Sequence, residues 1–152
     1  MSQKPLKRHK ALQPLSREHH HGLLLSWKIR AGFSKKIELD RIKIYADWFF
    51  KTHLKPHFEM EEQYVFSILE PNNELVKKAL ADHKLLKRLF ADENTEMALS
   101  KIEEVLDAHI RFEERVLFPE IQKVATEMQL LDIEKIHQET DFVDKLDDEF
   151  WK

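Results

Sequence analysis

Two stretches of the sequence share one pattern, and this pattern decides the fold. One reads HIRFEERVLFP and begins at His109; the other reads HFEMEEQYVF and begins at His57. Both contain a histidine, three residues, two glutamates, three residues and a phenylalanine. Residues four positions apart lie on the same face of an α-helix. His57 and Glu61 are therefore predicted to lie side by side. His109 and Glu113 form the matching pair. Each pair places an imidazole beside a carboxylate and is interpreted as half of a metal site.

The composition favours a helical protein. The chain has 152 residues, of which only 2 are glycine and 35% are charged. This length suits one domain with a sizeable core, and the shortage of turn formers predicts long helices rather than a sheet. A formal net charge of -3 argues against a nucleic-acid surface, which needs a concentrated basic face. The absence of cysteine excludes disulfides, thiolate zinc sites and iron–sulfur clusters.

No segment has the features of a membrane span or a signal peptide. The apolar run from Leu23 to Leu25 is far too short to cross a bilayer. Residues 1–13 are basic, and no apolar segment follows them as it would in a signal peptide. Because they also lack periodicity, they are predicted to form a loosely held N-terminal arm. We expect residues 14–152 to form a single domain of a cytoplasmic protein that binds neither membrane nor nucleic acid.

Apolar residues at helical spacing predict four long helices, over residues 15–31, 40–69, 74–90 and 96–125. Pro56 is predicted to kink the second, because proline lacks a backbone donor. Short turns between the helices favour an all-α fold, an up-down antiparallel four-helix bundle.

A further amphipathic segment covers residues 130–151, with apolar anchors that include Ile133, Phe142 and Phe150. It is predicted to be an extra C-terminal helix that covers one side of the bundle or helps to form a homodimer.

Each of the four main helices carries a histidine on a largely apolar face. The candidates are His19 or His20, His57, His83 and His109. Imidazoles and carboxylates suit first-row metal ions, and a carboxylate can bridge two of them. A buried, unpaired carboxylate would cost several kcal/mol, so Glu61 and Glu113 on inner faces indicate cations beside them. Glu62 and Glu114 are placed to orient histidine N–H groups.

A single histidine followed by an acid means little in a chain with nine histidines and 28 acidic residues. The repeat, together with one histidine on each remaining helix, favours the metal site. His53 is interpreted as a structural or pocket-edge residue rather than a further ligand, and His21 is expected to face water. Glu18 with His21, and Glu134 with His137, match the Glu-x-x-His string of ferritin-type sites, but neither lies within an apolar stripe and both are interpreted as coincidences.

These residues resemble the hemerythrin family, specifically the bacterial hemerythrin-like, or HHE cation-binding, domains. The resemblance rests on LSREHH from Leu15, HFEMEE from His57, Asp82 with His83, and the stretch from His109 to Pro119. It implies a four-helix bundle around two iron ions bridged by two carboxylates. By position, the bridges would be Glu61 and Glu113, and the terminal ligands His57, His83, His109 and His19, with His20 as the rival of His19.

The sequence departs from oxygen-carrying hemerythrins at Lys87, where these have a further histidine ligand. One iron would then have an open position or take His20 or His53. The resemblance implies a protein that binds or senses O2 or NO at a di-iron site. The alternatives are a di-iron oxidase or nitric-oxide reductase, which would need an electron donor, and iron handling at a mononuclear site. Apolar walls are expected from Leu23, Trp27, Phe58, Phe112 and Val116.

Overall fold

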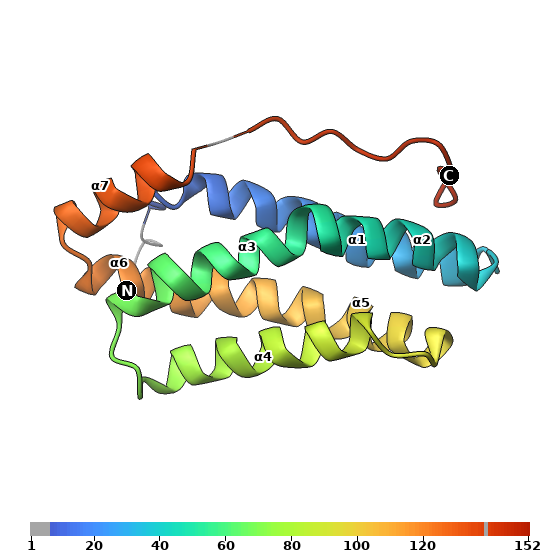
Figure 1. Ribbon diagram of the computed structural model, residues 1–152, viewed down its shortest axis with the longest axis horizontal. Coiled ribbons are helices and arrows are strands. Elements are labelled where there is room, and N and C mark those ends of the chain that lie inside the picture. The colour runs from blue at the N-terminus through green and yellow to red at the C-terminus, as the bar shows by residue number, and fades with distance from the viewer. Residues whose placement is uncertain (1–6, 139) are drawn as a thin grey trace, which may run out of the picture.

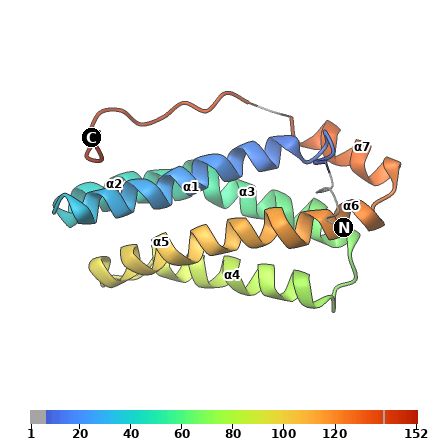
Figure 2. The ribbon, with the colours of Figure 1, turned by 180° about the vertical axis from the view of Figure 1, so that it is seen from behind.

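The computed structural model describes residues 7–138 and 140–152. Four long helical rods lie side by side in antiparallel order (Figure 1). The first rod is α1 (Gln13–Ser34) and the third is α4 (Glu74–Phe90). Seen from behind in Figure 2, the fourth rod, which begins with α5 (Thr95–Phe112), lies next to both of these. The predicted helical bundle is confirmed.

The second rod combines three kinds of helical turn, which follow one another without a break. In order they are α2 (Leu39–Phe49), a π-helical turn (Phe50–Leu54), α3 (Lys55–Met60), a second π-helical turn (Glu61–Val65) and a 3-10 turn (Phe66–Ile68). Pro56 lies in the first turn of α3, directly after the first π-helical turn. A wider turn relieves the clash between the proline ring and the preceding turn. The predicted interruption at Pro56 is therefore a π-helical turn rather than a break in the helix.

The fourth rod repeats this construction. It consists of α5 (Thr95–Phe112), a π-helical turn (Glu113–Leu117) and α6 (Phe118–Val124), with Pro119 in the first turn of α6. The π-helical turns at Glu61 and at Glu113 both begin at a glutamate of the repeated motif. Single π-helical turns inside α-helices often occur at functional sites. The two copies of the motif thus share a local conformation as well as a sequence pattern.

Within the part of the chain that the structure describes, the interior contains two separate clusters of buried apolar residues. Leu25 and Leu106 belong to one, and Leu15 and Leu117 to the other. On α1, His19 falls between Leu15 of the second cluster and Leu25 of the first. The histidines of the other three rods likewise fall between residues of the two clusters. Polar side chains at this level are therefore closed off from water on both sides.

The last helix is shorter than the sequence predicts. α7 covers Glu127–Ile136 and begins with a capping box formed by Thr126 and Gln129. Residues 140–149 contain no helix and run as an extended chain along α1 and α2 (Figure 1). The prediction of a helix over residues 130–151 is wrong beyond Ile136. We call residues 140–152 the C-terminal strap.

Contacts with the bundle hold the strap and explain why it is not helical. The Lys28 ammonium donates to Asp144 at 2.8 Å, and the Tyr45 hydroxyl donates to the same carboxylate at 2.6 Å. Farther along, Phe150 is only 2% exposed. An extended chain lets these anchors reach α1 and α2 together, so tertiary contacts override the helical pattern.

The described part of the expected N-terminal arm is packed against the bundle. Ala11 and Leu12 are completely buried, and the Arg8 guanidinium donates to the backbone oxygen of Glu114 at 2.6 Å. Residues 1–6 of the arm lie outside the described residues. Within the described ranges, no helix combines the length and apolar character needed to cross a membrane.

Candidate metal centre

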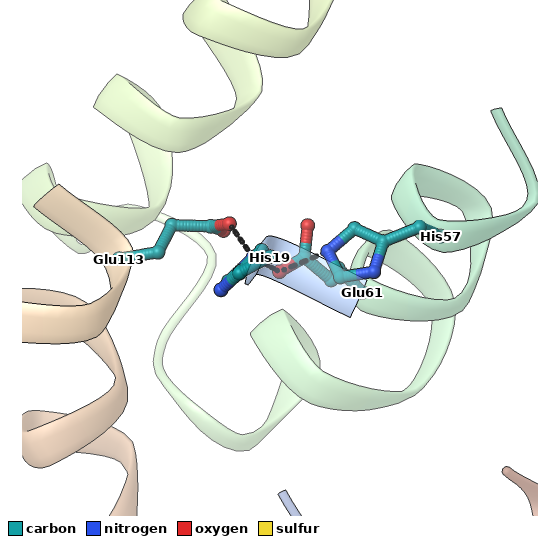
Figure 3. A group of neighbouring side chains, drawn as sticks. All are labelled: His19, His57, Glu61 and Glu113. Atoms are coloured by element: carbon teal, nitrogen blue, oxygen red, sulfur yellow. Dashed lines mark hydrogen bonds and ion pairs between the residues drawn. The ribbon is translucent and has the colours of Figure 1, made fainter. Parts of the chain in front are cut away.

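Six buried polar side chains meet between the two apolar clusters, with contributions from all four rods. None is more than 4% exposed, and both glutamates are completely buried. Figure 3 shows four of them turned toward one another. The six are His19, His57, Glu61, His83, His109 and Glu113.

Glu61 lies between histidines of three rods. Its Oε2 atom is 3.2 Å from Nε2 of His57 and 3.5 Å from Nε2 of His19. Its Oε1 atom is 3.2 Å from Nε2 of His83. The two oxygens of one carboxylate thus face different histidines, which is the arrangement that a bridging ligand needs.

Glu113 occupies the corresponding position on the fourth rod. Its Oε1 atom lies 3.0 Å from Nε2 of His19 and 3.2 Å from Nε2 of His109. The Nε2 atoms of all four histidines therefore converge on two carboxylates. The donor atoms form two groups of four, each within 4.8 Å, and both groups contain Glu61 and Glu113. His19 and His57 complete one group, and His83 and His109 complete the other.

A ring of carboxylates holds the outer face of the same histidines, because every Nδ1 atom donates to an acid on another rod. Glu18 accepts from His57, Glu62 from His83 and Glu114 from His19, each at 2.7 Å, and Asp82 accepts from His109 at 3.0 Å. The acid on the first rod accepts from the histidine on the second, and the acid on the second from the histidine on the third. In the same way, the acid on the third rod accepts from the histidine on the fourth, and the acid on the fourth from the histidine on the first. Such contacts fix the tautomer and the orientation of a ligand histidine.

Two of these four carboxylates were predicted from the sequence and two were not. Glu62 and Glu114 were expected to orient histidines, whereas Glu18 and Asp82 were not assigned this role. A signal was present, because each acid is adjacent in sequence to one of the six cluster residues. Glu18 also accepts from Nε2 of His137 at 2.9 Å, which ties the end of α7 to the centre.

The charges of the cluster perturb its titration. Burial alone would lower the pKa of His57, but the nearby charge of Glu61 and the hydrogen bond to Glu18 raise it to about 9. Burial opposes the charged form of His109 too, but Glu113 and Asp82 raise its pKa to about 9. Burial would raise the pKa of Glu61, but the surrounding histidines hold it well below its usual range. Glu61 is therefore an anion in a dry interior.

Several polar atoms of the cluster lack hydrogen-bond partners among the described residues. They are both oxygens of Glu61, Oε2 of Glu113 and Nε2 of His57. Buried polar atoms almost always have hydrogen-bond partners, but the histidine nitrogens near Glu61 approach its oxygens without hydrogen-bond geometry. Nitrogen and oxygen donors of this kind suit first-row metal ions. The donor set and its unsatisfied atoms therefore fit a metal centre.

The remaining candidates lie outside the two groups. His20 is exposed, whereas its neighbour His19 is 3% exposed. His53 is partly buried and belongs to neither group, and the Lys87 ammonium is 3.7 Å from Glu62 at the outer ring. The expectation that His21 faces water is wrong, because its ring stacks on Phe142 with a centroid separation of 3.9 Å.

The expected apolar walls are correct only in part. The Phe58 ring stacks on His83 at 3.8 Å between centroids and is buried. Trp27 and Val116 are 47% and 44% exposed and lie on outer faces. The predicted helical phase of these two residues is therefore wrong.

Comparison with known protein families agrees with this geometry. Residues 8–121 match the family described as Hemerythrin HHE cation binding domain. Searches of curated proteins and of solved structures returned no significant match. The matched region covers all four rods up to the middle of α6 and includes all six cluster residues. The chain therefore belongs to the hemerythrin HHE cation-binding domain family.

Proposed function

We propose that the protein binds two iron ions between its four helical rods and uses them to bind or sense O2 or NO. One observation carries the proposal: four imidazole Nε2 atoms converge on two buried carboxylates, and both oxygens of Glu61 and Oε2 of Glu113 lack hydrogen-bond partners among the described residues. Two cations would compensate the two carboxylates and use the unpaired atoms.

The two groups of donors suggest the role of each residue. His19 and His57 would hold one ion, His83 and His109 the other, and Glu61 and Glu113 would bridge them. Iron in such a site supplies the capacity to bind a diatomic ligand. The protein supplies four donors for each ion, fewer than the six of an octahedral ion, which leaves positions for a small ligand.

The residues around the centre would control water and protons. The outer carboxylates keep the Nδ1 hydrogen of each histidine in place, so that Nε2 is free to bind metal. The Phe58 and Phe118 rings pack against His83 and His19 at centroid distances of 3.8 and 5.3 Å. These rings shield the donor atoms and would limit access by bulk water.

Iron content and absorption spectra test the proposal. Metal-free protein is incubated anaerobically with ferrous iron, desalted and assayed for iron per chain. We expect about two irons per chain, in line with two groups of donors, and a new visible absorption band after exposure to O2 or NO. Less than one iron per chain, or two irons with no spectral response to either gas, would overturn the proposal.

A further inference from the structure

A small cavity lies directly against the proposed metal centre. Its volume is about 30 Å³, and His57 and His109 form part of its inner wall. Phe49 and Ile110 contribute apolar walls, and His21 and His53 also line it. A buried water needs roughly 10–15 Å³ on this measure, so the cavity has room for a ligand of two or three atoms.

The two additional histidines have unused hydrogen-bonding capacity. Nδ1 of His21 and Nε2 of His53 are buried and have no hydrogen-bond partner among the described residues. Both rings contact Phe142 of the strap, with centroid separations of 3.9 Å for His21 and 4.7 Å for His53. A buried polar atom without a partner requires an explanation. A ligand in the cavity would provide one.

The same residues also border a second, outer cleft. This outer cleft, of about 150 Å³, is lined by Arg17, Asp141 and Phe142. It also shares Glu18, His21 and His53 with the inner cavity. The two histidines and Phe142 therefore stand at the junction between the outer cleft and the space beside the centre.

We propose that His21 and His53 recognise the outer end of a small anionic or dipolar ligand, which enters through the outer cleft and lies between these histidines and the centre. This inference rests on the proposed function, because the inner end of the ligand would bind metal. A neutral imidazole can donate one hydrogen bond and accept another. Donors at this position favour ligands whose outer atom carries negative charge. The two histidines would thus select among ligands by charge, which apolar walls alone would not do.

Azide is a suitable probe, because it has three atoms and carries negative charge at its ends. Its dissociation constant is measured by absorption on ferric protein for the wild type, His53→Leu and His21→Leu. His20→Leu is the matched control, because His20 is an exposed histidine next to His21. Loss of one hydrogen bond weakens binding up to about tenfold, so we expect azide to bind about three- to tenfold more weakly to each cavity variant. The control should match the wild type.

Two further measurements separate the inference from the proposed function. Iron content should be unchanged in His53→Leu and His21→Leu, and azide should shift the imidazole ¹⁵N resonances of these two histidines but not of His20. Wild-type azide affinity in both cavity variants, with full iron content, would overturn the inference and leave the proposed function intact. Loss of iron from either variant would show that the residue supports the metal instead. If the wild type takes up less than one iron per chain, both proposals fall.

Discussion

The Nε2 atoms of His83 and His109 lie only 3.1 Å apart, although the two histidines come from different helical rods. Two N–H groups cannot both point into such a short gap. Two nitrogens bound at a right angle to one ion, with bonds of about 2.1 Å, would be roughly 3 Å apart. The outer carboxylates Asp82 and Glu62 hold both rings in this position. The spacing is therefore already close to what one metal ion requires.

The two groups of donors share only the glutamates. Substitution of a histidine should therefore affect the iron content differently from substitution of a bridging glutamate. His83→Leu removes a donor from one group and leaves the other complete, so we expect about one iron per chain to remain. Glu113→Gln removes a donor from both groups, and we expect most of the iron to be lost. Iron per chain after anaerobic loading and desalting provides the measurement.

Glu59→Gln is the control for the bridge variant, because Glu59 is an exposed glutamate on the motif of Glu61. It should bind as much iron as the wild type. Equal losses from His83→Leu and Glu113→Gln in folded protein would contradict the arrangement of two ions that share two bridges.

The outer ring of carboxylates should contribute to affinity without touching metal. Asp82→Asn weakens the hold on the His109 ring, because the amide lacks the charge that now accepts from Nδ1 at 3.0 Å. Loss of such a contact typically reduces metal affinity by about 10–100-fold. Competition with a chromophoric chelator would measure the change. Asp132→Asn, at an exposed position on α7, should leave the affinity unchanged, and an equal effect of both substitutions would count against the ring.

The metal-free protein should lose stability as the solution becomes alkaline. The pKa of His57 and that of His109 rise from 6.5 to about 9, so folding favours their charged forms. Their contribution is complete below pH 6.5 and disappears as the pH rises through about 9. The upper limit is on the order of 3 kcal/mol for each histidine, at about 1.4 kcal/mol per pKa unit.

Urea unfolding of metal-free protein at pH 6, 7.5 and 9 would reveal this dependence. Iron-loaded protein should show a much smaller decline, because the metal replaces the protons on the histidines. A flat stability profile for the metal-free protein between pH 6 and 9 would show that the histidines are not charged in its folded state.

The sequence was informative where the structure depends on local spacing. The separation of four residues between His57 and Glu61 was enough to place both on one helical face, and helical periodicity was enough to predict the bundle. The choice between His19 and His20 was not local, because it depends on how α1 is rotated against the other rods. The same limit applies to Glu18, whose partner His57 is on a different rod. Which rods are neighbours is a property of the folded chain.

The C-terminal strap shows the opposite case, in which a local pattern misled. Apolar residues from Leu131 to Phe150 repeat at a helical spacing, but the helix ends at Ile136. One polar anchor of the strap, the contact of Asp144 with Lys28, joins residues 116 positions apart. Helical propensity is a weak preference that such contacts override. The wider turn that begins at Glu61 had no recognisable sequence signal either, whereas the one at Glu113 is followed by Pro119.

The strap should also limit the rate at which small ligands reach the centre. Phe142 stacks on His21 and is part of both the inner cavity and the outer cleft. In Phe142→Ala the ring is gone, and we expect azide to associate and dissociate severalfold faster in stopped-flow experiments, with a smaller change in its dissociation constant. The cost in stability should be about 1–2 kcal/mol, because the ring is only half-buried. Val143→Ala is the control, since Val143 is 75% exposed beside it, and should leave both rates unchanged. Identical rates in the two variants would mean that ligands reach the centre by a path that avoids the strap.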